Sequence, residues 1–302
     1  MFSLQDWKNL IGKPSYDSYD KTPKLIKKYF FDEFDGELYL QPNGLLPNGK
    51  VIYQEVFVAL PKNLEKGKKL PAVAVPFYTY EWTLGMNVET GEKLKNKTAL
   101  LYDLVKRGYI CATAVAYHLS YIPGSVDEGP VWENASGAVM KDNPNWTGMG
   151  KFIEDTKRLI DILDDDERVD SDKIGLAGHS LGGKISLYTG FLDERIKVIV
   201  ASDFGLLWNQ TDWQDNRYWG KKVYDLKDKG VSNVDFLSIF PPKPLCVIVG
   251  YYDDDNTVKA LYNIKGYKER RENLFIINHA RGHKPPKYAL DGAYGFLDRF
   301  LK

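Results

Sequence analysis

Ser180, two histidines and a run of three aspartates are the residues whose types and order could do chemistry together in this chain of 302 residues. A serine hydroxyl is a weak nucleophile until a base removes its proton, and the base must itself be oriented by a third group. Ser180 lies within a Gly-x-Ser-x-Gly pattern at 178–182. That pattern is typical of a strained strand-to-helix turn that exposes the serine hydroxyl above a sheet. We therefore predict that Ser180 is a catalytic nucleophile.

Two histidines follow the serine in the chain, His279 and His283, both just after an apolar run at 274–277 that reads as a strand. We favour His283 as the base, because Gly282 before it permits a tight loop and Pro285-Pro286 after it fix the exit toward the last helix. His279 is closer to the strand. We expect it to be a packed or hydrogen-bonded structural residue.

The acid of the site should lie between the serine and the histidine, after the apolar strand at 245–250. Asp253, Asp254 and Asp255 stand there. Counting from the end of the strand favours Asp253, whereas counting back from Val258, where we expect the next helix to start, favours Asp255. We choose Asp253 as the group that orients the imidazole. The alternative is that the three carboxylates form a solvated turn or a weak cation site.

An ester or amide carbonyl under attack develops a negative charge that needs backbone N–H donors. The first donor should be Leu181, directly after the nucleophile. The second should come from the loop after the strand at 72–76, where Tyr78 is our choice and Thr79 the alternative. No stretch of the His-Gly-Gly-Gly type is present, so this second donor depends on position alone.

Three tryptophans, Trp208, Trp213 and Trp219, stand in a segment rich in Gly, Asn and aromatic residues. We predict that they form an aromatic cap that binds substrate. The alternative is that they pack this segment onto the body of the protein. The four histidines lack the spacing of metal ligands, so we expect no metal and no cofactor.

The elements that must position these residues alternate between strand and helix along most of the chain. Two strands at 34–40 and 52–60 should form an antiparallel opening pair, because Pro-Asn-Gly turn signals lie between them. Strand-like runs then alternate with helical patterns, which predicts an α/β fold with a mostly parallel central sheet and helices on both faces. The expected strands are 70–80, 109–117, 174–177, 198–202, 245–250 and 274–277, and the expected helices are 97–107, 149–163, the segment after Ser180, 258–270 and 288–301.

We expect one domain over residues 1–302, because no repeat, linker or low-complexity tract interrupts the pattern. Residues 1–33 should form a surface arm. The segments 118–148 and 205–240 should form insertions near the active site. The second of these contains the three tryptophans and would be the cap.

The composition of the chain limits the classes of molecule that we expect it to bind. Lys+Arg and Asp+Glu balance at 41 each, so no net charge favours nucleic acid or a membrane surface, and a small molecule or oligosaccharide is the expected partner. The two cysteines, Cys111 and Cys246, lie in apolar runs and should be buried free thiols. The N-terminus lacks the pattern of a signal peptide, so a cytoplasmic location is expected. The oligomeric state and the identity of the acyl group are left open.

The chain resembles the α/β-hydrolase superfamily, in particular its dienelactone-hydrolase-like and acetyl xylan esterase-like branches, over roughly residues 50–302. The resemblance lies in the motif at 178–183 with the segment 167–175 before it, Gly250 with its acidic turn, the Trp-rich segment after 202–205, and Gly282-His283 before an aromatic helix. It implies that Ser180 is the nucleophile and His283 the base, with the acid among residues 253–255. True dienelactone hydrolases have cysteine where Ser180 stands, and this departure argues for ester hydrolysis of the serine type and against the lactone chemistry of that branch. The resemblance implies an esterase acting on acylated carbohydrates.

Two other functions are compatible with these residues. A serine peptidase of the oligopeptidase-like branch would use the same groups, but it usually carries a large accessory domain that this chain lacks. A non-catalytic binding protein could share the fold, since a fold does not determine function. The ordered serine, aspartate and histidine argue against this second alternative.

Overall fold

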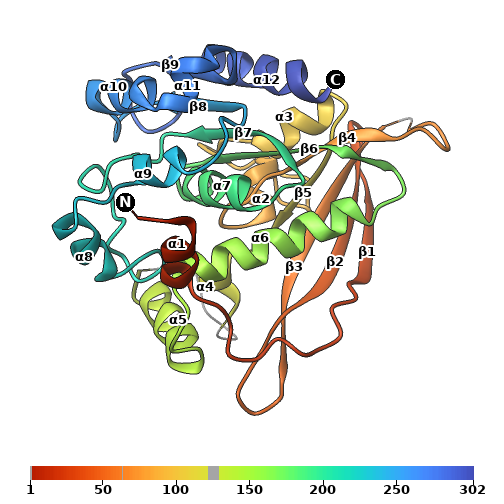
Figure 1. The fold of residues 1–302 in the computed structure, drawn as a ribbon. Helices are drawn as coiled ribbons and strands as arrows, with labels where there is room; N and C mark the ends of the chain where they lie inside the picture. Colours follow the sequence, from red (N-terminus) through yellow and green to blue (C-terminus); the bar gives the residue numbers. More distant parts are fainter. Residues whose placement is uncertain (1, 63, 122–128) are drawn as a thin grey trace.

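One mixed β-sheet organises the protein. The computed structural model describes residues 2–62, 64–121 and 129–302, without the side chains of residues 129–132. Nine strands of the described chain form a sheet in the order β1-β2-β3-β5-β4-β6-β7-β8-β9 (Figure 1). In this order the pairs from β1 to β5 are antiparallel, and the pairs from β5 to β9 are parallel. This arrangement confirms the predicted fold class.

The bounds of the elements follow the chain from its N-terminus. The strands are β1 (Lys24–Phe30), β2 (Phe34–Leu45), β3 (Val51–Pro61), β4 (Leu70–Ala74), β5 (Ile110–Ala114), β6 (Val169–His179), β7 (Ile196–Ser202), β8 (Leu245–Val249) and β9 (Leu274–Asn278). The helices are α1 (Leu4–Ile11), α2 (Tyr80–Leu84), α3 (Leu100–Lys106), α4 (Tyr117–Ser120), α5 (Gly129–Asp142), α6 (Gly148–Asp164), α7 (Leu181–Leu192), α8 (Lys222–Asp228), α9 (Asn233–Ser238), α10 (Asp255–Asn263), α11 (Lys265–Glu269) and α12 (Lys287–Leu301), with a 3₁₀ turn at Arg271–Asn273.

Each face of the sheet is covered by its own hydrophobic core. On one face α6 and α7 pack with α1 against the strands, and on the other face α3 and α12 do so. Every residue of β8 is buried. A strand buried on both faces must be apolar throughout, because no position faces water. This explains why the parallel strands were visible in the sequence as short continuous apolar runs.

The N-terminal segment contributes to the sheet and to the core. Ser3 caps α1 through reciprocal hydrogen bonds with Asp6, which satisfies N–H groups that the first turn of a helix leaves open. Trp7 is fully buried and its ring contacts Tyr188 of α7 and Phe236 of α9. After α1 the chain returns as the edge strand β1. The segment predicted as a surface arm therefore includes one strand and a core tryptophan.

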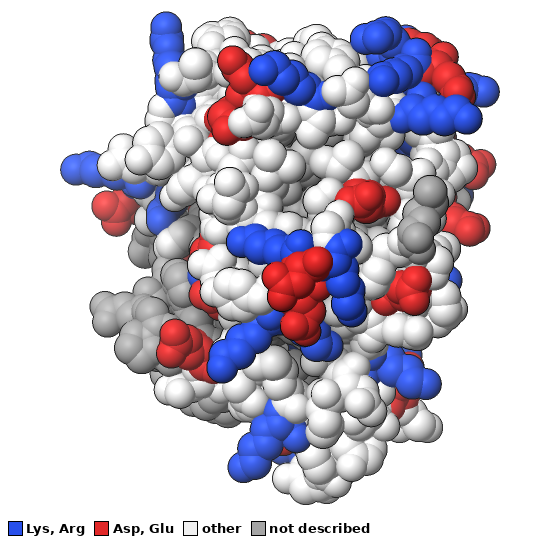
Figure 2. All heavy atoms as spheres, turned by 60° about the vertical axis from the view of Figure 1, so that its left-hand side comes forward, with Lys and Arg blue, Asp and Glu red and all other residues white. Residues whose placement is uncertain are grey.

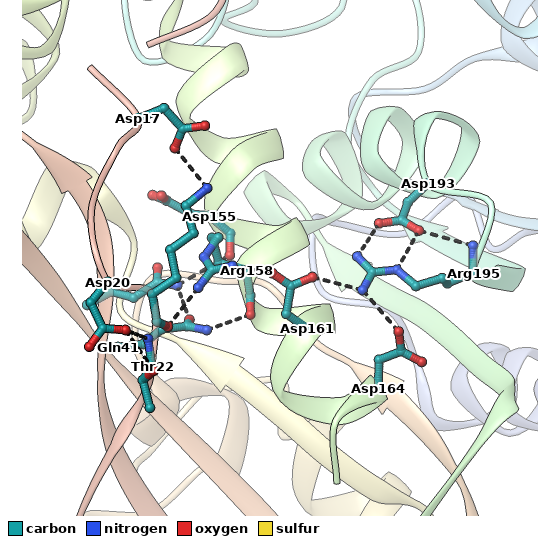
Figure 3. Close-up of polar contacts among 12 residues, drawn as sticks. Asp17, Asp20, Thr22, Gln41, Asp155, Arg158, Asp161, Asp164, Asp193 and Arg195 are labelled. Atoms are coloured by element: carbon teal, nitrogen blue, oxygen red, sulfur yellow. Dashed lines mark hydrogen bonds and ion pairs between the residues drawn. The ribbon is translucent and has the colours of Figure 1, made fainter. Parts of the chain in front are cut away.

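Between α1 and β1 the chain lies along α6 and is held there by polar contacts (Figure 3). Arg158 of α6 donates a hydrogen bond to the carbonyl of Lys21 at 2.9 Å and also pairs with Asp161. Arg195, just before β7, donates to the other oxygen of Asp161 at 2.8 Å. Asp161 thus joins Arg158, which holds the N-terminal segment, to the turn before β7.

Several predicted elements differ in extent. The run at 70–80 forms a strand only to Ala74, because Pro76 follows and a new helix, α2, begins at Tyr80 after its cap at Thr79. The predicted helix at 258–270 is split into α10 and α11, since Ile264 adopts an extended conformation between them. The two insertions contain the short helices α4, α5, α8 and α9, and in Figure 1 α5, α8 and α9 lie near α1.

Charge is finely mixed on the surface. Figure 2 shows one face of the molecule, on which Lys and Arg side chains lie beside Asp and Glu side chains in small groups separated by uncharged surface. In the part of the chain that the structure describes, none of the helices is long and apolar enough to span a bilayer. Cys111 and Cys246 are both buried as free thiols, as predicted.

Candidate active site

Ser180 occupies a strained turn between β6 and α7, at the centre of the sheet. Its backbone has φ 55° and ψ −116°, a conformation that an L-residue other than glycine rarely adopts and that costs free energy. The N–H of Ser180 donates to the carbonyl of Ser202 at 2.8 Å, and its own carbonyl accepts from Lys184 N–H at 3.1 Å. The strain is therefore held by hydrogen bonds to the next strand and to the first turn of α7.

The glycines on either side of the serine allow the backbone to pack closely. A Cβ at Gly178 would overlap the carbonyl oxygen of Gly182 and lie 2.7 Å from Ser186 Oγ. A Cβ at Gly182 would overlap the carbonyl oxygen of Pro76. The Gly-x-Ser-x-Gly spacing therefore follows from two steric contacts, and one of them places α7 directly against the loop after β4.

His283 is the histidine that meets the serine. Its Nε2 lies 2.8 Å from Ser180 Oγ, within hydrogen-bond distance, although 103 residues separate the two in the chain. A base must be this close to the proton it removes. Burial lowers the pKa of His283 below its usual value, and the positive charge of Lys184 lowers it further. The imidazole is therefore neutral at pH 7 and can accept a proton.

The ring of His283 is held by other rings and by its loop. Its centroid lies 4.7 Å from that of His179 and 4.8 Å from that of Tyr252. The carbonyl of Gly282 accepts from Tyr251 N–H at 3.1 Å, which joins the loop after β9 to the loop after β8. The Nδ1 atom of His283 is buried, and none of the described residues forms a hydrogen bond with it.

Asp253 lies at the end of β8 but is not brought to His283. Its carboxylate accepts from the N–H groups of Gly205 at 3.3 Å and Leu206 at 3.0 Å, and from the hydroxyl of Thr257 at 3.4 Å. Burial raises the pKa of Asp253, and these hydrogen bonds oppose that rise. The carboxylate thus supports the chain after β7. Its role as the orienting acid stays a prediction from its place in the sequence.

The structure also places Asp254 and Asp255, the other two aspartates that follow β8. Asp254 caps α10 by accepting from the N–H groups of Asn256 and Thr257. Asp255 is the first residue of that helix and is exposed. Neither has a described hydrogen bond with either histidine of the loop.

A second pair, Asp203 and His279, was not found from the sequence. Asp203 Oδ1 lies 2.9 Å from His279 Nε2, and both side chains are fully buried. His279 Nδ1 accepts a hydrogen bond from Arg281 N–H at 3.2 Å. In the neutral ring the proton is therefore on Nε2, which donates a hydrogen bond to Asp203 Oδ1. Ser202 Oγ donates to the other oxygen of Asp203 at 2.6 Å. His279 is thus the hydrogen-bonded structural histidine that we expected, but its partner was missed.

The two residues expected to donate to the oxyanion lie on segments that contact each other. Leu181 is the first residue of α7, so its N–H has no partner within the helix. Tyr78 lies in the loop after β4, which contacts the start of α7 through Pro76 and Gly182. The carbonyl of Tyr78 accepts from Ala116 N–H at 2.9 Å and so is turned toward β5. Their joint action on a developing oxyanion stays a prediction.

Lys184 is a buried cation one turn after the serine. Its ammonium pairs with Asp212 and lies 4.1 Å from the ring centroid of Tyr218. Burial lowers the pKa of Lys184 to about 8, whereas the negative charge of Asp212 opposes this change. Because the charges of Lys184 and Asp212 both act on His283, this pair belongs to the electrostatic surroundings of the site.

The three tryptophans predicted to bind substrate are buried. Trp208 donates from its indole to the carbonyl of Val231 at 2.7 Å, and Trp213 donates to that of Gly205 at 2.6 Å. The ring of Trp219 packs against Trp7 and Tyr188. These side chains fix the segment 205–240 to α7 and α1, which is the packing alternative. They present no open face to a substrate.

Exposed aromatic side chains occur instead next to His283. Tyr251 is 71% exposed and Tyr252 is 37% exposed. They follow directly after the buried strand β8. The sequence signal was their place at the end of a strand, just before the predicted acid, and we did not use it.

Comparison with known proteins begins with sequence. No family model matches the chain. A stretch of 163 residues, half of this chain, is 27% identical to the protein named "Putative hydrolase YtaP" from Bacillus subtilis (strain 168). That stretch spans 54% of the relative's length, so the match covers about half of each protein.

Solved structures match the fold over nearly the whole chain. A glucuronoyl esterase from Solibacter usitatus has a TM-score of 0.71 at 14% identity and covers 97% of this chain and 89% of its own. A CE15 glucuronoyl esterase from Teredinibacter turnerae T7901 has a TM-score of 0.68 at 17% identity, with 96% and 80% covered. An acetyl xylan esterase from Paenibacillus sp. R4 has a TM-score of 0.61 at 12% identity, with 94% and 90% covered. At such identities the likeness establishes the fold.

Proposed function

We propose that this chain, which has the α/β-hydrolase fold, is a serine carboxylic-ester hydrolase that works through an acyl-enzyme. The observation that carries the proposal is the hydrogen-bond distance of 2.8 Å between Ser180 Oγ and His283 Nε2. Its second support is the strained backbone of Ser180, since strain of this kind is concentrated at functional sites.

In the proposed reaction Ser180 Oγ attacks the ester carbonyl while its proton passes to His283 Nε2. The carbonyl oxygen becomes an oxyanion, which the N–H groups of Leu181 and Tyr78 stabilise. The C–O bond to the alcohol then breaks, and His283 returns the proton to the leaving oxygen. A water molecule then gives a proton to His283 and attacks the acyl-enzyme. The bond between the acyl carbon and Ser180 Oγ breaks, His283 returns the proton to that oxygen, and the carboxylic acid leaves.

The charge state of His283 supports this sequence of steps. A general base must be unprotonated when the reaction starts, and a low pKa keeps it so near neutral pH. Burial and the charge of Lys184 lower the pKa of His283. The positive charge of the imidazolium that forms after attack then favours rapid return of its proton to the alcohol.

The proposed substrates are esters of carbohydrates. The solved structures with the same fold include enzymes named as glucuronoyl esterases and acetyl xylan esterases. The balanced charge of the chain gives no preference for a strongly acidic or basic partner. A small neutral or weakly charged sugar ester fits both observations.

Two measurements test the proposal. A fluorophosphonate probe should label the folded protein at Ser180 alone, as located by mass spectrometry, and the His283→Ala protein should label far more slowly. Acetylated xylo-oligosaccharide should be hydrolysed, whereas an aminoacyl amide should not. Failure of labelling would favour a non-catalytic protein, and preference for the amide would favour a peptidase.

A further inference from the structure

Tyr251 and Tyr252 form an exposed aromatic pair at the active-site edge of the sheet. We propose that this pair is the subsite for the alcohol part of the ester, and that it stacks on the flat C–H face of a pyranose ring. The inference rests on the proposed esterase function and goes beyond it, because it assigns the part of the substrate that these side chains contact.

The first support is the position of the two rings relative to His283. The ring of Tyr252 lies edge-on to the imidazole, with centroids 4.8 Å apart and planes at 71°. The ring of Tyr251 lies edge-on to that of Tyr252, with centroids 5.2 Å apart and planes at 80°. The ring of Tyr252 thus lies between those of His283 and Tyr251, and exposure rises from 37% at Tyr252 to 71% at Tyr251.

The second support is the direction in which the alcohol must leave. His283 returns its proton to the alcohol oxygen from the same Nε2 that contacts Ser180 Oγ. The alcohol therefore departs on the side of the imidazole, while the carbonyl oxygen points toward Leu181 and Tyr78. The ring of Tyr252 adjoins this imidazole, and we therefore assign the alcohol to the side of the two tyrosines.

The third support is the cost of leaving these rings in water. Burying an aromatic side chain is worth about 1.5–3 kcal/mol, so an exposed pair forgoes that stabilisation. The tryptophans predicted for this task are buried. Tyrosine offers an apolar face for stacking and a hydroxyl for hydrogen bonds with sugar hydroxyls, and it has few rotatable bonds to immobilise on binding.

The backbone holds Tyr251 close to the catalytic loop. Its N–H donates to the carbonyl of Gly282 at 3.1 Å. The backbone of Tyr251 is therefore held close to His283, which directly follows Gly282. Such a relation is what a subsite needs in order to align the leaving oxygen with Nε2.

The test compares two acetate esters that differ only in their alcohol, acetylated xylo-oligosaccharide and ethyl acetate. Tyr251→Ala should lower kcat/KM for the sugar ester about tenfold more than for ethyl acetate, which corresponds to about 1.4 kcal/mol. The loss should appear mainly in KM. Tyr251→Phe should recover most of this loss, because the stacking face is kept.

Tyr53→Ala is the matched control, at a tyrosine of β3 that is 46% exposed. It should leave both rates unchanged.

Equal losses on both esters in Tyr251→Ala and Tyr252→Ala would overturn the inference, because the rings would then only support His283. Unchanged rates on both would overturn it as well. These results are distinct from failure of the proposed function, in which the native protein would hydrolyse neither ester.

Discussion

His279 Nε2 donates a hydrogen bond to Asp203 Oδ1 at 2.9 Å, while His283 Nε2, four residues later, lies 2.8 Å from Ser180 Oγ. The two histidines of one loop therefore have separate contacts. His279 anchors the start of the loop to the end of β7, and His283 is the base that we propose. Asp203 and His279 are fully buried. Water therefore cannot take the place of this hydrogen bond, which we call the anchor, without a local rearrangement.

The role of Asp253 can be measured with Asp253→Asn. Its hydrogen bonds run to Gly205, Leu206 and Thr257, and an asparagine oxygen can still accept some of them. With Asp253 engaged only in these hydrogen bonds, kcat for an acetate ester should fall by no more than about tenfold. Loss of a triad acid costs about 10⁴-fold. A loss of that size would show that Asp253 orients His283 as its place in the sequence predicts, and that its carboxylate leaves Gly205 and Leu206 during the reaction.

The glycine at the end of β8 should be essential to the anchor. A Cβ at Gly250 would overlap Asp203 Oδ1 and lie 2.6 Å from His279 Nε2. Gly250→Ala should therefore destabilise the protein by about 1–3 kcal/mol and lower kcat, since the loop that carries His283 would shift. Gly282→Ala is the control. A Cβ there meets no atom within 4 Å, so both quantities should stay near those of the native protein. Urea unfolding and kinetics on one ester measure them, and equal effects of the two changes would refute the anchor.

The pair Lys184 and Asp212 should set the pH at which the enzyme becomes active. The base works when it is neutral, so kcat/KM falls as pH drops through the pKa of His283. The charge of Lys184 lowers that pKa, and the charge of Asp212 raises it. Lys184→Met should therefore move the acid limb of the pH profile to higher pH, and Asp212→Asn should move it to lower pH. Shifts in the same direction would contradict this electrostatic account.

A buried ion pair in α6 should matter for stability rather than activity. Lys151 pairs with Asp155 and donates to the carbonyl of Asn43 at 2.9 Å. Burial raises the pKa of Asp155 to about 6, although the charge of Lys151 opposes the rise. Lys151→Met should lower the free energy of unfolding by about 3–5 kcal/mol, because it leaves a buried carboxylate without its partner.

Two further variants check this stability effect. Lys151→Met combined with Asp155→Leu should recover part of the loss, because no unpaired charge is then buried. Lys27→Met breaks an exposed pair with Glu89 and should change the free energy of unfolding by less than about 1 kcal/mol. A double variant less stable than Lys151→Met, measured by urea unfolding, would contradict the explanation.

The turn at Ser180 could be predicted from sequence because its geometry depends on neighbours in the chain. Gly178 is required by its close contact with the carbonyl of Gly182 in the same motif, whereas Gly182 is required by the carbonyl of Pro76, which lies far earlier in the chain. The choice of His283 over His279 agrees with the observed contact, but the physical reason differs from the one we gave. Gly282 is not in the left-handed region, and Ala280 has the positive φ, 48°, in this loop.

The pair Asp203 and His279 could not be predicted because it joins residues 76 apart. The pair depends on the ends of β7, β8 and β9 lying level with one another at the same edge of the sheet. Local patterns do not show which of several polar residues at neighbouring strand ends will meet. The same limit applies to Asp253, whose partners at 205–206 follow a different strand.

The tryptophans show a different limit. Aromatic residues in a loop-rich segment either pack that segment or line a cleft, and composition is the same in both cases. Trp213 is buried because it contacts Tyr188 of α7, and Trp208 because its ring meets Trp213. The exposed tyrosines after β8 could have been found by asking which aromatic residues directly follow a parallel strand.

The central claim is that Ser180 becomes acylated with His283 as its base, and the rate of ester hydrolysis by Ser180→Ala tests it most directly. On p-nitrophenyl acetate the substituted protein, folded as judged by circular dichroism, should lose at least about 10⁴-fold in kcat. Turnover within tenfold of the native protein would contradict the account.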